Sequence, residues 1–215
     1  VEWSRAMVAE TIGADPREIV WTSGATESDN LAIRGLLEGM ANSTGRHKII
    51  TMETEHKAVL DTCAHLSDAE VVYLRPESDG LLSLDSLAKV LDDSVLLVSA
   101  MLVNNETGVI QPMKEIAAMA HDVGALMHSD LAQAVGKLPW TVDSLAIDLG
   151  SLSAHKAHGP KGIGALYVRR GSCRVAEQQH GGNHERGMRS GTLPTHQIVG
   201  MGEAYRIVQL DSNAE

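Results

Sequence analysis

Short apolar runs alternate with amphipathic helical patterns along this 215-residue chain, and this alternation restricts the fold more than any other feature. The runs have the length and composition of strands buried on both faces, and they cover residues 19–22, 48–51, 71–74, 95–99, 125–128, 145–149 and 164–168. Helical periodicity covers residues 1–9, 28–40, 58–67, 84–91, 113–123 and 196–210. Strands separated by helices predict an α/β fold, with a mostly parallel central sheet flanked by helices. We expect one domain, because no internal repeat or linker interrupts the pattern.

Charge and cysteine content exclude several classes of protein. The chain has 18 Lys and Arg against 28 Asp and Glu, a net charge of −10. An acidic balance without basic runs argues against binding to nucleic acid or to an anionic membrane surface. No apolar stretch approaches the roughly 18 residues of a membrane span. Two cysteines, Cys63 and Cys173, cannot build a disulfide framework, so we expect a cytoplasmic protein.

The ends of the predicted strands carry the unusual residues, and ligands of parallel sheets bind outside the carboxyl ends of the strands. Residues 22–30 follow the first strand and turn through Gly24 into a helix. Free backbone N–H groups there, with the hydroxyl of Thr26, would bind an anion. An ordinary helix N-cap by Ser or Thr is the alternative. The segment is not a P-loop, because no Gly-Lys-Ser/Thr follows.

Asp130 stands at the end of another apolar run, where a carboxylate is costly unless a partner compensates its charge. The positively charged ring nitrogen of a cofactor would be such a partner. Alternatively, Asp130 caps a following helix, and Gln133 then completes a capping box.

Ser153, His155 and Lys156 follow a further apolar run and precede a Gly/Pro loop. A lysine at such a strand end can be desolvated and become a nucleophilic amine, whereas the alternative is a surface lysine. His155 and His158 could bind zinc by residue type, but no HExxH or CxxC motif accompanies them, so no metal site is predicted. The Gly-rich residues 180–194 could face a phosphate or form a mobile connection.

Together these segments contain the parts of a pyridoxal phosphate site. The lysine forms the Schiff base, the aspartate pairs with the ring nitrogen, and the turn holds the phosphate. The sequence resembles the class V aminotransferase family of fold-type I pyridoxal phosphate enzymes, and within it cysteine desulfurases of the iron–sulfur-cluster and nitrogen-fixation type. The matching segments span nearly the whole chain in family order: residues 22–30, 54–61, 103–108, 128–133, 153–162 and 180–194.

The resemblance implies a domain assignment and roles for single residues. Residues 1–215 would form the large, cofactor-binding domain, without the family's N-terminal segment and C-terminal small domain. Lys156 would be the Schiff-base lysine, and His56 would stack on the ring and move protons, which makes these two the catalytic residues. Asp130 would pair with the ring nitrogen and Gln133 with the ring hydroxyl, while Asn105 would lie near that hydroxyl and the substrate carboxylate.

The phosphate contacts implied by the resemblance come from two subunits. Within one chain the phosphate would be held by Ala25, Thr26, Ser153 and His155. Thr192 would reach the phosphate of the neighbouring subunit, which implies a homodimer with shared sites.

The implied reaction converts L-cysteine to L-alanine and passes sulfur to an enzyme cysteine as a persulfide, for acceptors such as an iron–sulfur scaffold protein. The family's sulfur-accepting cysteine and its carboxylate-binding arginine are expected beyond Thr192 and outside this chain. Cys63 lies in a helical pattern and is predicted to be a small core residue. Cys173 lies in a basic stretch that could lower its pKa, but its position does not match the family motif.

Two alternatives to a cysteine desulfurase remain at this point. One is another class V enzyme, such as a selenocysteine lyase or an aminotransferase, and the other is a cofactor-binding fragment without turnover. Because neither cysteine matches the acceptor position, we expect the 215-residue chain by itself to lack desulfurase turnover.

Overall fold

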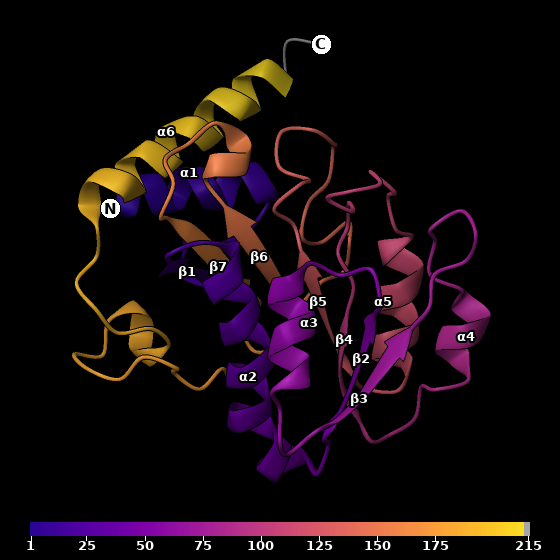
Figure 1. The fold of residues 1–215 in the computed structure, drawn as a ribbon. Helices are drawn as coiled ribbons and strands as arrows, with labels where there is room; N and C mark the ends of the chain where they lie inside the picture. The colour runs from indigo at the N-terminus through magenta and orange to yellow at the C-terminus, as the bar shows by residue number, and fades with distance from the viewer. Residues whose placement is uncertain (213–215) are drawn as a thin grey trace.

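The computed structural model describes residues 1–212 and has one seven-stranded sheet in the order β1-β7-β6-β5-β4-β2-β3 (Figure 1). The strands are β1 Ile19–Thr22, β2 Lys48–Met52, β3 Glu70–Leu74, β4 Val95–Ser99, β5 Leu126–Asp130, β6 Leu149–Ser153 and β7 Gly164–Val168. β7 runs antiparallel to both of its neighbours, and the remaining pairs are parallel. The carboxyl ends of six strands therefore share one edge of the sheet with the start of β7.

Helices cover both faces of the sheet. They are α1 Glu2–Ile12, α2 Ala25–Thr44, α3 Lys57–Ala64, α4 Leu84–Ala88, α5 Met113–Asp122 and α6 Thr195–Ser212. One apolar cluster joins the sheet to α2 and α3, through residues such as Leu36 and Val59. A second cluster joins the opposite face to the other helices, through residues such as Ile12, Ile116 and Ile198. The predicted α/β architecture is therefore confirmed.

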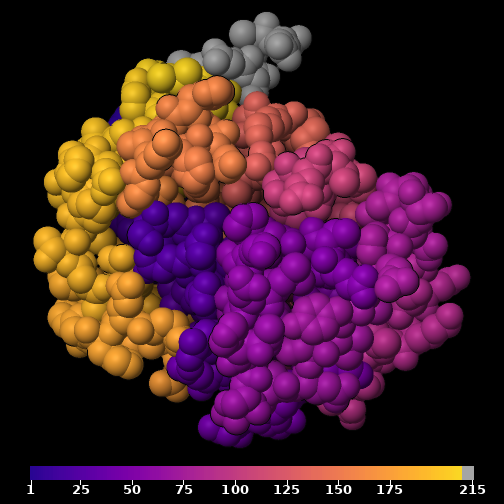
Figure 2. All heavy atoms as spheres, in the orientation of Figure 1, coloured from indigo at the N-terminus to yellow at the C-terminus, as the bar shows by residue number. Residues whose placement is uncertain are grey.

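A close approach of α1 to α6 explains one glycine. A Cβ atom at Gly202 would lie 2.6 Å from the Cβ of Ser4, so only glycine lets the two helices pack at this separation. Figure 2 shows α6 and the preceding residues 170–194 along one side of the molecule. Among the described residues, no helix combines the length and the apolar character that a membrane crossing requires.

One predicted strand was placed wrongly. The apolar run at residues 145–149 predicts a strand there, but β6 is Leu149–Ser153. Residues 142–146 form turns instead, because Thr141 and Ser144 exchange side-chain and backbone hydrogen bonds and Ala146 has a positive φ of 53°. The consequence is that Ser151 and Ser153 belong to a buried strand rather than to the segment that follows it.

The bounds of other elements differ by a few residues from the sequence pattern. The second predicted helix begins at Ala25 rather than at residue 28, and α4 ends at Ala88 rather than at residue 91. β5 extends to Asp130, two residues beyond the predicted end, which makes Asp130 the last residue of the strand.

A buried ion pair attaches residues 180–190 to β1, the edge strand. Arg5 of α1 donates to both carboxylate oxygens of Glu185, at 2.7 and 2.9 Å. The side chains are 6% and 3% exposed. Arg5 also donates to the carbonyl oxygen of Ile19, and Glu185 accepts from the backbone N–H of Trp21. These bonds occupy backbone groups on the free edge of β1 and so protect an otherwise open sheet edge.

Replacing Glu185 should destabilise the protein strongly. Glu185→Ala leaves the buried Arg5 guanidinium with only the exposed carboxylate of Glu2 as an anionic partner. We expect a loss of about 3–5 kcal/mol in the free energy of unfolding, measured by urea denaturation. Glu203→Ala is the matched control, because it removes an exposed ion pair with Arg206 and should cost far less. Equal losses in the two variants would contradict the assigned role of the buried pair.

Candidate functional site

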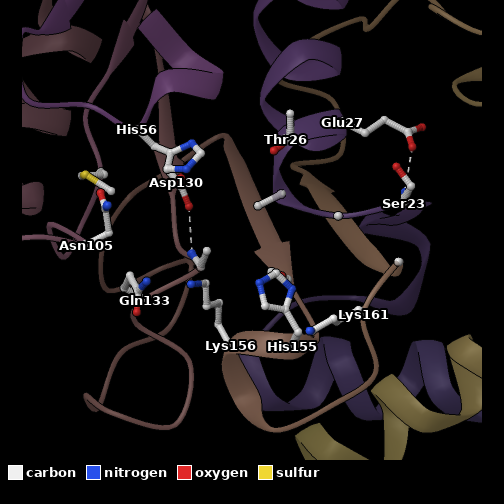
Figure 3. A pocket seen from close by; sticks show the side chains of 16 residues that line it. Ser23, Thr26, Glu27, His56, Asn105, Asp130, Gln133, His155, Lys156 and Lys161 are labelled. Carbon is white, nitrogen blue, oxygen red and sulfur yellow. Dashed lines mark hydrogen bonds between the residues drawn. The ribbon is translucent and has the colours of Figure 1, made fainter.

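A cavity of about 460 Å³ lies at the sheet edge where the carboxyl ends of the strands meet (Figure 3). Its volume is in the range of small-molecule and cofactor sites. Nine of the ten predicted site residues line it, which are Ala25, Thr26, His56, Asn105, Asp130, Gln133, Ser153, His155 and Lys156. The lining also includes Ser23, Gly24, Glu27, Met101, Ala132, Lys161 and Gly162, which the sequence analysis did not assign to the site.

The N-terminus of α2 forms one wall of the cavity. Gly24 is the N-cap residue, and no side chain of the described residues makes a cap hydrogen bond. The alternative of an ordinary Ser or Thr cap is therefore wrong. A Cβ at Gly164 would lie 2.6 Å from the Cα of Gly24, so close packing of β7 against the turn requires glycine. The backbone N–H groups at this helix start, together with Thr26, remain suited to bind an anion.

Glu27 links the start of α2 to the loop that contains Arg189. Its carboxylate accepts from the backbone N–H of Ser23 at 2.7 Å and from Arg189 at 2.7 Å. Burial opposes ionisation, but the bonds from Arg189 and Ser23 prevail and lower the pKa of Glu27. A charged Glu27 thus fixes the turn that carries the anion-binding N–H groups.

Asp130 ends β5 at the opposite side of the cavity from Thr26 (Figure 3). It is 4% exposed, and its Oδ1 accepts from the backbone N–H of Ala132 at 2.9 Å. The alternative of a helix cap with Gln133 is wrong, because residues 132–137 form turns. Burial raises the pKa of Asp130, while the Ala132 N–H, His56 and Lys156 act in the opposite direction. Asp130 therefore lacks a cation strong enough to offset its burial.

Lys156 and His155 lie in a short 3-10 helix, His155–Ala157, directly after β6. The Lys156 side chain is exposed to the cavity, so the expectation of a desolvated lysine is wrong for the protein without a ligand. Ser153 and His155 are paired, with 2.9 Å between Oγ and Nδ1. Burial lowers the pKa of His155, and the positive charges of Lys156 and Lys161 lower it further. His155 and His158 belong to no cluster of three metal-binding side chains among the described residues.

His56 and Asn105 reach the cavity from two further strand ends. His56 is the N-cap of α3, and its Nδ1 accepts from the backbone N–H of Ala58 at 3.0 Å. In a neutral ring the proton therefore resides on Nε2. Asn105 lies in a turn that Asn104 organises: the Asn104 amide donates to the carbonyl oxygen of Thr54 and accepts from the N–H of Glu106 and of Thr107.

Glu55 is a buried acid next to this site that the sequence analysis missed. Its Oε1 accepts from the backbone N–H of Met101 at 2.8 Å, which connects the segment after β2 to the segment after β4. Its Oε2 has no hydrogen-bond partner among the described residues. Burial raises the pKa of Glu55 to about 8. An acidic residue between a turn and an N-cap histidine is an ordinary surface pattern, so the sequence contained no signal for its burial.

The tenth predicted residue, Thr192, is exposed and does not line the cavity. No other residue of 180–194 lines the cavity either, so the interpretation of this segment as a phosphate-facing loop finds no support within one chain. The two cysteines also lie away from the cavity lining. Cys63 is buried in α3, as predicted, and burial raises its pKa to about 12. The basic stretch around Cys173 does not lower its pKa, because burial raises it to about 11.

A profile of the family described as "Aminotransferase class-V" matches residues 1–214. The chain belongs to the aminotransferase class V family. It is 55% identical over 218 residues to the cysteine desulfurase IscS of Edwardsiella ictaluri, and 57% identical over 214 residues to that of Vibrio vulnificus. These alignments cover 100% and 98% of this chain but 54% and 52% of the relatives. The chain thus spans about half the length of the curated relatives it matches.

Solved structures share the fold. A "NIFS-like protein" superposes with a TM-score of 0.93 at 39% identity and covers 99% of this chain, which covers 59% of that structure. A structure described as "SspA in complex with cysteine" gives a TM-score of 0.88 at 42% identity, with 95% and 59% covered. These findings confirm the predicted family and fold type. Class V aminotransferases and cysteine desulfurases are pyridoxal phosphate enzymes, which confirms the predicted cofactor for the family.

The residues that are present fit this cofactor. The uncapped start of α2 and the Ser153–His155 pair offer donors for a phosphate. Asp130, buried without a compensating cation, offers the counter-ion for a protonated ring nitrogen. Lys156 offers an amine between these two regions, as Figure 3 shows. One cavity therefore combines groups suited to an anion, to a cation and to a Schiff base, which are the three kinds of contact that the cofactor requires.

Lys156 rather than Lys161 should carry the cofactor, although both lysines line the cavity. Lys156 acts electrostatically on Asp130 as well as on His155, whereas Lys161 acts on His155 at the phosphate side. Loading with pyridoxal phosphate, borohydride reduction and peptide mapping should locate the label on Lys156. Lys156→Ala should remove the label and Lys161→Ala should retain it. A label on Lys161 would overturn the assignment.

Glu55 should make stability depend on pH. Its folded pKa of about 8 exceeds its ordinary value, so the folded protein binds a proton that the unfolded chain has lost above about pH 5. This stabilisation is present below about pH 4.5 and is lost as the pH rises to about 8. In urea denaturation, the free energy of unfolding should decline with rising pH by several kcal/mol less in Glu55→Gln than in the wild type. The exposed control Glu53→Gln should leave the wild-type decline unchanged, and an unchanged decline in Glu55→Gln would show that Glu55 is not buried as an acid.

Proposed function

We propose that the protein to which this chain belongs is a pyridoxal phosphate-dependent cysteine desulfurase. It would convert L-cysteine to L-alanine and pass the sulfur to a protein thiol as a persulfide. The proposal rests on the cavity, which combines Lys156, Asp130 and the uncapped N-terminus of α2. The identity of 55–57% to proteins named cysteine desulfurase supports the choice of substrate.

Each group in the cavity has a physical task in this reaction. Bound pyridoxal phosphate supplies a carbonyl group that condenses with amines and a ring that accepts electrons from the substrate carbon. The N–H groups at the start of α2, with Thr26, Ser153 and His155, hold the phosphate. Asp130 keeps the ring nitrogen positively charged, which strengthens its pull on electrons as the Cα–H bond breaks.

Proton transfer falls to Lys156 and His56. With pyridoxal phosphate bound, the Nζ of Lys156 would take the α-proton of cysteine. His56 would stack on the ring, with the proton of its neutral imidazole on Nε2, because Nδ1 accepts from the Ala58 N–H. Gln133 and Asn105 lie on the same side of the cavity as Asp130, where they would bind the ring hydroxyl and the substrate carboxylate (Figure 3).

Sulfur transfer requires a thiolate near the substrate sulfur. Cys63 and Cys173 do not meet this requirement, because burial raises their pKa values to about 12 and about 11. The proposal therefore assigns sulfur acceptance to a cysteine other than these two. We further propose a homodimer in which Thr192 reaches the partner's phosphate site, which its exposure permits. A role in iron–sulfur cluster assembly, with a scaffold protein as acceptor, is proposed from the relatives named IscS.

A cytoplasmic location is also part of the proposal. Both cysteines are free thiols, and Cys173 is only partly buried, which suits a reducing compartment.

The test of the proposed function is production of alanine and sulfide from L-cysteine by the full-length protein loaded with pyridoxal phosphate. Lys156→Ala should abolish both products. Turnover of selenocysteine without turnover of cysteine, or transamination of cysteine without sulfide release, would replace the proposal with another class V activity.

Asp130→Ala should weaken catalysis far more than folding. We expect kcat/KM for alanine production to fall at least about 100-fold, because Asp130 stabilises charge that develops in the transition state. The free energy of unfolding without cofactor should change by no more than about 1 kcal/mol, because loss of the Ala132 hydrogen bond is offset by removal of a poorly compensated buried acid. An unchanged kcat/KM would show that Asp130 does not pair with the ring.

A further inference from the structure

Asp29, in the second turn of α2, is a fully buried acid without a task in the mechanism above. Its side chain is 0% exposed, and neither carboxylate oxygen makes a hydrogen bond to any described residue. Burial of an unpartnered acid is costly unless a neighbouring group compensates it. Figure 3 shows Asp130 at the cavity wall, whereas Asp29 is out of contact with solvent.

Asp29 and Asp130 are close enough to affect each other. A carboxylate oxygen of Asp29, a carboxylate oxygen of Asp130 and a ring nitrogen of His56 all lie within 4.8 Å of one another. Two carboxyl groups at this separation in a buried site do not both ionise readily, so one of them keeps its proton.

The other groups that face Asp29 supply no compensating cation. His128 of β5 places Nε2 3.6 Å from Asp29 Oδ1, but burial lowers the pKa of His128 to about 3, so its ring is neutral. The hydroxyls of Ser99 and Ser151 occupy the two ring nitrogens of His128, at 2.8 and 3.0 Å. On the α3 side, Glu55 and Cys63 both have raised pKa values.

The surroundings of the two acids differ in a way that decides where the proton resides. Asp130 accepts a backbone hydrogen bond, and the positive charge of Lys156 favours its ionised form. Asp29 accepts no backbone hydrogen bond from the described residues, and no lysine or arginine contributes to the shift of its pKa. Burial raises the pKa of Asp29 well above its ordinary value, and the charge of Asp130 raises it further, although the Ser151 hydroxyl acts in the opposite direction.

We propose that Asp29 is a positioning residue that stays protonated and donates its carboxyl proton toward Asp130, so that the negative charge of the pair rests on Asp130 beside the cofactor ring nitrogen. The donation is direct after a small side-chain rotation or passes through one water molecule. The proposal rests on the proposed function, because it gives Asp29 a task only where a ring nitrogen meets Asp130.

The physical consequence concerns the proton of the ring nitrogen. A hydrogen bond donated to the charged form of Asp130 favours that form and lowers its affinity for a proton. The proton then stays on the ring nitrogen. Without the donor, Asp130 competes for this proton, and the ring loses part of the positive charge on which its electron-withdrawing power depends. The neutral acid thus acts through Asp130 and touches neither cofactor nor substrate.

The first experiment needs no cofactor. Carboxyl ¹³C NMR titration of the chain labelled at Asp should show Asp29 protonated at pH 7, with an ionisation well above the ordinary range. Asp130→Asn should move that ionisation to lower pH, because the neighbouring charge is gone. An ionised Asp29 at pH 7, or an ionisation that Asp130→Asn leaves unchanged, overturns the proposal.

The second experiment compares two nearly isosteric variants loaded with pyridoxal phosphate labelled with ¹⁵N at the ring. Asp29→Asn keeps a donor but cannot ionise, whereas Asp29→Leu has no donor. We expect the ring ¹⁵N signal at pH 8 to stay at the protonated position in wild type and in Asp29→Asn, and to move toward the unprotonated position in Asp29→Leu. The dissociation constant for the cofactor should rise about tenfold or more in Asp29→Leu and less than about threefold in Asp29→Asn.

Equal behaviour of the two variants, or wild-type behaviour of Asp29→Leu, overturns the proposal. If Asp29→Leu does not fold, the titration of the wild type and of Asp130→Asn still decides it. Failure of the proposed function has a different signature, because wild type would then form no Schiff base with pyridoxal phosphate while the carboxyl titration remained measurable.

Discussion

A buried carboxyl group at the end of β5 is the feature on which the rest of the site depends. Asp130 is 4% exposed and receives one backbone hydrogen bond, so the fold holds a negative charge where water cannot stabilise it well. Such a group lowers stability unless a cation arrives. Asp130 therefore lacks a compensating cation, and a positively charged cofactor ring would supply one. Affinity for the cofactor follows from this attraction.

The topology of the sheet explains why the complementary groups lie around this carboxyl. Parallel strands bring their carboxyl ends to one edge, and each end contributes one piece: the start of α2 after β1, His56 after β2, Asn105 after β4, and Lys156 after β6. β7 runs the other way, so its beginning, near Lys161 and Gly162, reaches the same edge. Residues that are neighbours in the site need not be close in the sequence, because the order of the strands in the sheet sets their spacing.

The sequence pattern predicted those parts that depend on local chemistry. Apolar runs located six of the seven strands, and residue types at strand ends pointed to cavity residues such as Asp130, Ser153 and Lys156. Other lining residues, such as His56 and Asn105, came only from the family resemblance. The prediction for β6 was wrong because Leu145 and Ile147 look like strand residues, whereas the strand itself contains Gly150, Ser151 and Ser153. Small polar residues form a buried strand there because Gly150 accommodates Leu131 at close range, a contact that only the tertiary structure reveals.

The residues that sequence reasoning missed share one property: their role depends on burial, not on type. Asp29 and Glu55 are ordinary helix and turn residues in sequence, yet the sheet and α3 enclose both of them. His128 was part of a recognised segment, but its neutral state follows from burial, with the hydroxyls of Ser99 and Ser151 on either side of its ring.

A neutral His128 behind Asp29 and Asp130 leaves the two acids without a counter-ion, so the acids must share protons among themselves. The cofactor side of Asp130, where His56 and Lys156 lie, is then the one direction in which positive charge can stabilise the pair, and this asymmetry directs the cation to the position where the chemistry needs it.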